Sequence, residues 1–307
     1  MSAVIRANQL AKRFGPVEVL TGLDLEVPEG SIFGLIGPNG VGKTTTIKIL
    51  MNILKATSGR VEVLGVDSSQ LSPARLSQIG YVSENQEMPD WMTVRYLLEY
   101  LKPFYPTWDD ARADELIRQF TLHRDRKLRH LSRGMRMKAA LASSLAYHPR
   151  LLVMDEPFSG LDALVREDLI QCLVESAGET TILISSHDLA EIESFASHIG
   201  YLADGRLKFS EEMTSLTSRF REVEIIVAPP ASVPGEREWP KTWLQPQASS
   251  ALVRFVETHF EPNRTTDEIH RVFGDVQQIS VNAMPLRSIF ITLAREGGDH
   301  ARSLADL

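Results

Sequence analysis

The sequence lacks what several classes of protein require. Only one of its 307 residues is a cysteine, Cys172, so an intrachain disulfide and a zinc site built from cysteine thiolates are excluded. No stretch reaches the ~18 consecutive apolar residues of a membrane-spanning helix. The first residues also lack the apolar run of a secretory signal peptide. We therefore expect a protein of a reducing compartment that reaches a membrane only through another chain.

Positive charge is also scarce, because Lys and Arg number 33 against 40 Asp and Glu, for a net charge of −7. A surface that binds nucleic acid needs a basic excess, so we expect no nucleic-acid partner. A small basic pocket for phosphates is still compatible with this charge. The content of 43% hydrophobic and 24% charged residues is ordinary for a globular protein. The length predicts one large domain and a smaller one.

Strands and helices alternate through the first two thirds of the chain, which predicts an α/β fold with a parallel sheet. Short strands are expected around the turn at Gly15 and Pro16. A segment at about 86–146 has helical apolar spacing and is broken near Pro103. The remaining expected strands cover 31–36, 61–64, 151–154, 181–184 and 199–202, with helices at 44–54, 164–177 and between the last two strands.

The composition changes at about residue 210. Two alternating segments, 222–227 and 251–258, are expected to be strands separated by a proline-rich stretch at 229–246. A helix is expected at 268–273, and a short apolar segment follows at 288–293. We therefore predict a main domain at 1–209 and a small α+β accessory unit at 210–307, in which we identify no chemistry.

A glycine-rich stretch between a predicted strand and a predicted helix matches the P-loop pattern. Its glycines let successive backbone N–H groups curl around a phosphate, and the helix N-terminus adds partial positive charge. Lys43 is expected to reach the β- and γ-phosphates of ATP, and Thr44 to offer its hydroxyl to Mg²⁺. The predicted nucleotide-binding residues are Gly37, Pro38, Asn39, Gly40, Val41, Gly42, Lys43, Thr44 and Thr45.

Two carboxylates, Asp155 and Glu156, follow the apolar strand expected at 151–154. In sheets of this kind, ligands bind at the carboxyl ends of the strands. Asp155 is expected to hold Mg²⁺ and Glu156 to polarise the attacking water as a general base. Alone, such a pair is more typical of a solvated strand end. Together with the P-loop it predicts a site for ATP and Mg²⁺.

Three further motifs carry a family resemblance. The stretch Leu131 to Met135, Leu-Ser-Arg-Gly-Met, resembles the Leu-Ser-Gly-Gly-Gln signature of ATP-binding cassette (ABC) proteins. The stretch Ser159 to Asp162 is similar to the D-loop of that family, and His187 follows a strand as the family's switch histidine does. With the P-loop and the carboxylate pair, five motifs stand in the family's order. The chain thus resembles the nucleotide-binding subunit of an ABC transporter, which implies a P-loop NTPase core with a helical insert.

The resemblance implies a role for each matching residue. Phe14 stands where the family has an aromatic residue, usually tyrosine, that stacks on adenine. Ser132 and Gly134 correspond to groups that contact the γ-phosphate bound by the opposite subunit. His187 would contact the γ-phosphate and steady the water, and Asp162 would link the two sites across a homodimer.

The sequence departs from the family pattern at two positions. Glu84 stands where the Q-loop has glutamine, and Arg133 and Met135 replace a glycine and a glutamine of the signature. The Glu84 carboxylate can still face Mg²⁺, so it joins Thr44 and Asp155 as a candidate metal ligand. It also brings negative charge near the γ-phosphate. We hypothesise that Arg133 of the opposite subunit compensates this charge in trans when ATP closes the dimer. The alternative is that Arg133 faces solvent or a phosphate.

The function implied by the resemblance is ATP hydrolysis, with Glu156, His187 and Lys43 as catalytic residues. A homodimer sharing two ATP sites would power a separate transmembrane permease, placing the chain in the cytoplasm at the inner face of the membrane. The permease would bind near residues 85–93. The Arg-Gly-Met variant of the signature and the Phe-Tyr-Pro-x-Trp stretch at 104–108 resemble bacterial exporters.

Three other functions are open to a protein with these motifs. ABC ATPases that act on ribosomes resemble two fused cassettes, whereas this chain has one P-loop and one signature. Chromosome-maintenance ATPases separate the nucleotide motifs by a long coiled coil, and no sustained heptads lie between the motifs here. A regulatory cassette without hydrolysis would require that Glu84 or Arg133 be disabling.

Overall fold

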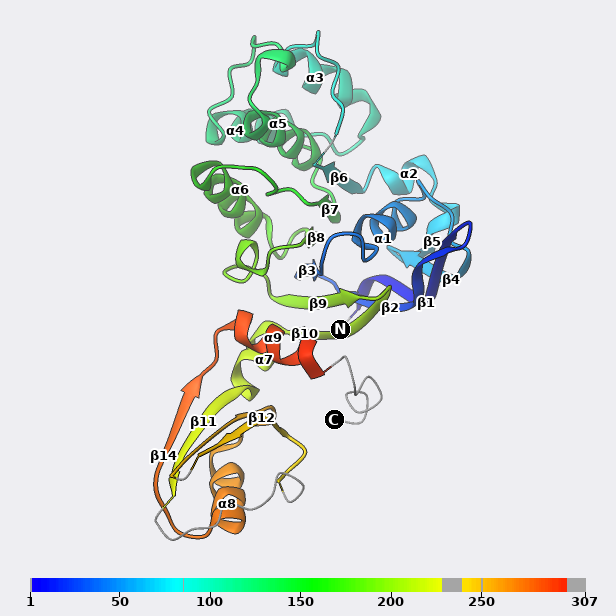
Figure 1. The fold of residues 1–307 in the computed structure, drawn as a ribbon. Helices are drawn as coiled ribbons and strands as arrows, with labels where there is room; N and C mark the ends of the chain where they lie inside the picture. Colours follow the sequence, from blue (N-terminus) through cyan, green and yellow to red (C-terminus); the bar gives the residue numbers. More distant parts are fainter. Residues whose placement is uncertain (1, 85, 228–238, 250, 297–307) are drawn as a thin grey trace. The chain divides into compact units, whose positions relative to one another are not determined.

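The computed structural model describes residues 2–84, 86–227, 239–249 and 251–296 (Figure 1). The chain divides into two compact units, Met1–Ser210 and Glu211–Leu307. Within the described residues, no helix combines the length and the apolar character needed to cross a bilayer.

A six-stranded sheet forms the centre of the first unit, with the strand order β10-β9-β3-β8-β7-β6. The five strands from β9 to β6 pair in parallel. Strands β3, β7 and β8 are wholly buried, as expected for apolar strands covered on both faces. The strands are β3 (Ile32–Ile36), β6 (Ile79–Ser83), β7 (Leu151–Asp155), β8 (Thr181–Ser186), β9 (His198–Ala203) and β10 (Arg206–Glu212).

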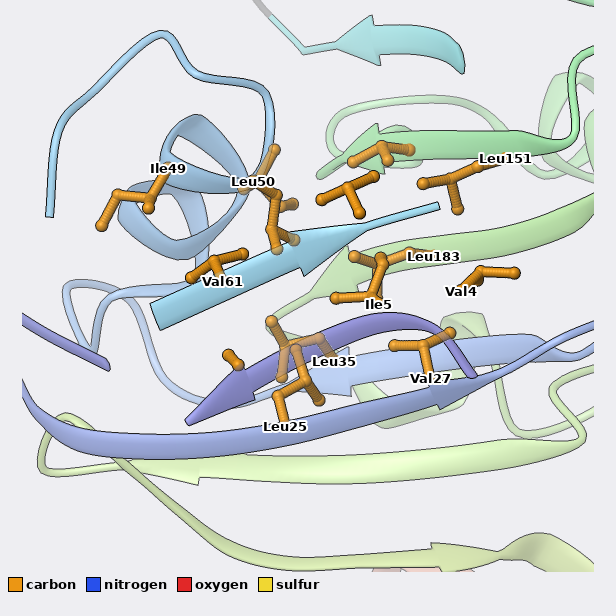
Figure 2. Packing of buried hydrophobic residues seen from close by; sticks show 14 of the residues in the cluster. Val4, Ile5, Leu25, Val27, Leu35, Ile49, Leu50, Val61, Leu151 and Leu183 are labelled. Atoms are coloured by element: carbon orange, nitrogen blue, oxygen red, sulfur yellow. The ribbon is translucent and has the colours of Figure 1, made fainter. Parts of the chain in front are cut away.

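An antiparallel sheet, ordered β2-β1-β4-β5, packs on this core. Its strands are β1 (Ala3–Phe14), β2 (Val17–Pro28), β4 (Ser58–Val63) and β5 (Val66–Asp67). Figure 2 shows Ile5, Leu25 and Val61 of this sheet in one cluster with Leu35 and Leu183 of the parallel strands. Each such fully buried side chain stabilises the fold by about 1.5–3 kcal/mol. The cluster includes Phe33 and Leu35 of β3 and so fixes the strand from which the next loop begins.

Helices α3, α4 and α5 form an insert between β6 and β7. Thr93 caps α3, Asp109 caps α4 and Ser132 caps α5, each by accepting a hydrogen bond from a backbone N–H of the first turn. The helices of the first unit are α1 (Lys43–Leu50), α2 (Pro73–Leu76), α3 (Val94–Leu101), α4 (Asp110–Gln119), α5 (Arg133–Leu145) and α6 (Ala163–Ser176), with 3-10 turns at Ser68–Gln70, Lys102–Phe104, Leu128–His130 and Leu189–Glu191.

The second unit contains an antiparallel sheet of order β12-β13-β11-β14. Its core is aromatic: Trp243 stacks on Phe255 with ring centroids 4.0 Å apart, and Trp239 meets Phe273 edge to face. The elements are α7 (Met213–Arg219), β11 (Arg221–Val227), β12 (Trp243–Ala248), β13 (Leu252–Glu257), α8 (Pro262–Phe273), β14 (Val276–Ala283) and α9 (Leu286–Glu296).

The structure differs from the expected elements in several places. The helix expected at 268–273 begins at Pro262, and β10 and α7 were not expected. The short strands expected near Gly15 are two paired strands of 12 residues each. The helix expected at 44–54 ends at Leu50, and Asn52 beyond it has a φ of 56°. Between β8 and β9 only a 3-10 turn, Leu189–Glu191, replaces the expected helix. Strands β12 and β14 were not expected, because their polar sequences hide the alternating pattern.

Candidate active site

The P-loop connects the buried strand β3 to the N-terminus of α1. Gly37 and Gly42 cannot be replaced here without strain. A Cβ on Gly37 would stand 2.1 Å from the carbonyl oxygen of Leu202, and Gly42 has a φ of 112°. Pro38, Asn39 and Gly40 form the exposed tip of the loop, Val41 is half-buried, and Thr45 lies half-buried in the first turn of α1. The loop backbone is thus shaped to receive an anion at a helix N-terminus.

Lys43 begins α1 and is buried. Its Nζ donates to the carbonyl oxygens of Gly37, at 2.7 Å, and Pro38, at 3.1 Å. It also forms an ion pair with Glu156 Oε1 at 3.1 Å. A buried ammonium group needs such partners, because an unpaired buried charge is costly.

Asp155 ends β7 and is buried beside the P-loop. The Thr44 hydroxyl donates to Asp155 Oδ1 at 3.1 Å, and the Ser185 hydroxyl donates to the same oxygen at 2.7 Å. Ser185 Oγ also accepts the backbone N–H of Glu156 at 3.0 Å. Ser185 is not among the site residues that the sequence motifs predict. The available signal was its place at the end of the neighbouring strand β8, in register with Asp155.

Glu156 directly follows β7 and has a φ of 51°, in the left-handed region. Such strained positions are frequent at catalytic sites. One carboxylate oxygen of Glu156 faces Lys43, and the other lies 2.7 Å from His187 Nδ1. The hydrogen bond with Glu156 raises the pKa of His187 above its ordinary value, although partial burial opposes the rise. The structure therefore brings three predicted catalytic side chains together at the carboxyl edge of the sheet.

Glu84 and Arg133 form an ion pair within one chain. Arg133 Nη2 lies 2.5 Å from Glu84 Oε1. Partial burial acts to raise the pKa of Glu84, but hydrogen bonds from Arg133 and Ser159 outweigh it and hold this pKa below its usual value. The sequence did not predict this intrachain pairing, which arises because the first turn of α5 brings Arg133 to the end of β6 in the same chain. The pairing in trans, in a dimer closed by ATP, stays a prediction.

The other residues implied by the resemblance have local partners in the described structure. Ser132 Oγ accepts the backbone N–H of Met135 at the start of α5, and Asp162 Oδ1 accepts that of Val165 at the start of α6. Both side chains are therefore helix caps in their own chain. Gly134 packs closely against Val165.

Phe14 ends β1 with 47% of its surface exposed. The ammonium group of Lys12 lies 4.8 Å from its ring centroid. The half-exposed ring of Phe14 is thus accessible for stacking on a nucleotide base.

The donor set at the P-loop suits a hard cation. Among the described residues there is no cluster of three or more His, Cys, Asp or Glu able to hold a metal ion. A hydroxyl and one carboxylate, as in Thr44 and Asp155, are however the sparse oxygen ligands that suffice for Mg²⁺ when substrate phosphates and water supply the rest.

The parallel sheet, the glycine loop at its carboxyl edge and the lysine and carboxylates around that loop define a P-loop nucleoside triphosphatase. The family model described as ABC transporter matches residues 20–159. The ABC transporter ATP-binding protein YtrB of Bacillus subtilis (strain 168) is 33% identical over 72% of this chain and 76% of its own length. The chain belongs to the ABC transporter ATP-binding protein family.

Two further comparisons agree with this assignment. The bacitracin transport ATP-binding protein BcrA of Bacillus licheniformis is 33% identical over 67% of this chain and 69% of its own length. The dimeric structure of MJ0796, a bacterial ABC transporter cassette, superposes with a TM-score of 0.61 at 25% identity, covering 68% of this chain and 98% of that chain. The protein is thus the ATP-binding and ATP-hydrolysing subunit of an ABC transporter. Subunits of this family dimerise and work with a transmembrane permease.

Proposed function

We propose that the residues around the P-loop hydrolyse ATP at two sites shared by a homodimer. The observation that carries the proposal is the meeting of Lys43, Glu156 and His187 beside the Thr44–Asp155 pair. Lys43 and the P-loop backbone hold the triphosphate, with Phe14 against the base. Ser132 and Gly134 of the partner subunit, with its Asp162, complete each site. The negative charge of ATP attracts the positive N-terminal end of α5 in the partner subunit and so favours dimerisation.

In this proposal Lys43 exchanges one partner for another. In the described structure its charge is met by Glu156 and two loop carbonyls. The phosphates of ATP offer more negative charge and take the ammonium group. Glu156 is then left beside His187 and free to accept a proton from water. Thr44 and Asp155 would hold Mg²⁺, which neutralises phosphate charge, and Glu84 joins them only when it leaves Arg133.

We further propose that the protein powers export and acts at the inner face of the cell membrane through its permease. The support is the bacitracin transport named for BcrA and the exporter-like signature. The expected permease contact near residues 85–93 stays a prediction, and Asn85 lies outside the described residues.

The test is the variant Glu156→Gln. It is expected to retain ATP binding while the hydrolysis rate falls by ~10²-fold or more, the scale for loss of a general base. Binding is measured by equilibrium dialysis and hydrolysis by phosphate release. Glu193→Gln, which changes an exposed glutamate beyond β8, is the matched control and is expected to hydrolyse ATP at the parent rate. A parent-like rate in Glu156→Gln would show that another group is the base.

The shared sites have their own test. Light scattering of Glu156→Gln is expected to give the mass of a dimer with ATP and Mg²⁺, and a lower mass without nucleotide. An unchanged mass, with and without the permease, would contradict the shared sites.

A further inference from the structure

The Glu84–Arg133 ion pair joins the helical insert to the edge of the catalytic sheet. Arg133 is the first residue of α5. Glu84 directly follows β6, and its backbone N–H donates to the carbonyl oxygen of Asp155 at 2.9 Å. Glu84 is therefore fixed beside the residue proposed to hold Mg²⁺, while its side chain reaches away to α5.

The guanidinium group of Arg133 also lies close to the turn before α6. A Cβ on Gly160 would stand 3.2 Å from Arg133 Nη1, and Gly160 has a φ of 67°, so glycine both permits the turn and leaves room for the arginine. The Ser159 side chain, in the same turn, hydrogen-bonds the Glu84 carboxylate. The Glu84–Arg133 pair thus links the end of β6, the start of α5 and the turn at 159–162.

We infer that Glu84 and Arg133 are positioning residues whose ion pair forms an intrachain latch. The latch holds the signature, residues 131–135, at the start of α5 in the nucleotide-free chain. It opens as ATP closes the dimer. The inference rests on the proposed shared sites. The side chains are 29% and 48% exposed, so the pair is of the weak, screened kind that can open at little cost. Triphosphate at the P-loop places negative charge near Glu84 and competes for the guanidinium group. Ser132, next to Arg133 and still the cap of α5, then meets the ATP of the partner subunit.

The experiment uses the full-length chain with Glu156→Gln, so that bound ATP persists. Light scattering gives the ATP concentration at half-maximal dimerisation for Arg133→Gln, Glu84→Gln and both together. Each single change is expected to lower this concentration by about 2–5-fold, the range for loss of an exposed ion pair. The double change is expected to add nothing, because either change already opens the latch.

The matched control is Arg136→Gln, which removes another ion pair made by α5, that between Arg136 and Asp90 at 2.7 Å. It is expected to leave the ATP concentration unchanged. A shift as large in this variant would show that loosening α5 in any way has the same effect, and would overturn the latch.

The signs of the two single effects separate the latch from its alternatives. Effects of opposite sign would mean that each charge acts on the nucleotide directly. An increase of the ATP concentration at half-maximal dimerisation in both single variants would mean that the pair stabilises the closed dimer. An unchanged concentration in both would mean that the pair neither restrains nor stabilises it. Each of these results overturns the latch.

Hydrogen exchange without nucleotide gives a second measurement. Amides at 132–136 and 159–162 are expected to exchange several-fold faster in both single variants and unchanged in Arg136→Gln. Parent-like exchange would overturn the latch. If Glu156→Gln itself fails to dimerise with ATP, the shared sites are wrong, and hydrogen exchange alone decides whether the latch exists.

Discussion

At the scale of single residues, the charged side chains of the site find partners among themselves. The Glu156 carboxylate meets Lys43 on one oxygen and His187 on the other. The buried Asp155 is met by two hydroxyls rather than by a cation. Hydroxyl partners can be shared with an arriving cation, since their lone pairs remain available. The charged side chains of the site are therefore paired with one another and already arranged for a charged ligand.

The pairing of His187 predicts a pH dependence of stability. Because folding raises the pKa of His187, the pair contributes stability that is fully present below the unfolded pKa of about 6.5 and is lost as pH rises through the higher folded pKa. We expect nucleotide-free His187→Ala to unfold more easily than the parent at about pH 6 and equally at about pH 9. The side chain is 40% exposed, so the difference stays below about 1 kcal/mol.

Thermal unfolding at both pH values measures this difference. The control is His123→Ala, which removes an exposed histidine of the helical insert and should leave the difference between the two pH values unchanged. A His187→Ala deficit that grows toward alkaline pH would contradict the assignment.

At the scale of elements, the start of α5 depends on close packing against α6. Ser132 caps α5, Asp162 caps α6, and Gly134 lets the two helices approach. The two caps and the glycine are also the residues proposed to face the partner subunit. Their local contacts hold the signature in position before a dimer forms.

Gly134→Ala tests this packing. In an open helix the change would stabilise the protein by roughly 0.5–1 kcal/mol. Here the new Cβ would stand 2.8 Å from Val165 Cγ1, and valine has little rotamer freedom with which to move aside. We expect a net loss of about 1–3 kcal/mol in the free energy of unfolding, measured by urea denaturation. Val165→Ala in the same chain should recover most of it, and a stabilised single variant would show that the helices have room.

At the scale of the whole molecule, every nucleotide motif lies in the unit Met1–Ser210. The sheet of that unit includes β10, which continues to Glu212. Arg206 Nε donates to the carbonyl oxygen of Thr21 at 2.9 Å and so joins β10 to the antiparallel sheet. The composition changes near residue 210, but the last strand of the core runs past this point.

Truncation tests the independence of this unit. A chain ending at Glu212 is expected to fold and to bind ATP with the affinity of the full chain, measured by calorimetry. A chain ending at Arg206 loses β10, leaves one side of β9 unpaired and is expected to melt at a lower temperature. A soluble 1–212 chain that fails to bind ATP would show that the second unit is needed for the site.

The sequence by itself determined the α/β core, the P-loop and the order of the motifs. These are local properties of the chain. Glycines at fixed spacing, an apolar strand before two carboxylates and a signature of consecutive residues are legible because neighbours in the sequence carry the signal. Strands β12 and β14 could not be predicted in this way, because they lack an alternating apolar pattern of their own. Polar residues such as Gln277 and Gln278 of β14 are held in a strand by pairing with β11, and β12 is held by pairing with β13.

Only the tertiary structure decided which distant residues meet. Ser185 reaches Asp155 because β8 pairs with β7, and Lys43 reaches Glu156 because a loop and a strand end converge at one edge of the sheet. Glu84 and Arg133 pair within one chain, since the insert folds back toward the end of β6. Charge and hydrogen-bonding capacity are written in the sequence, but the choice of partner depends on distances that exist only after the strands and helices have packed.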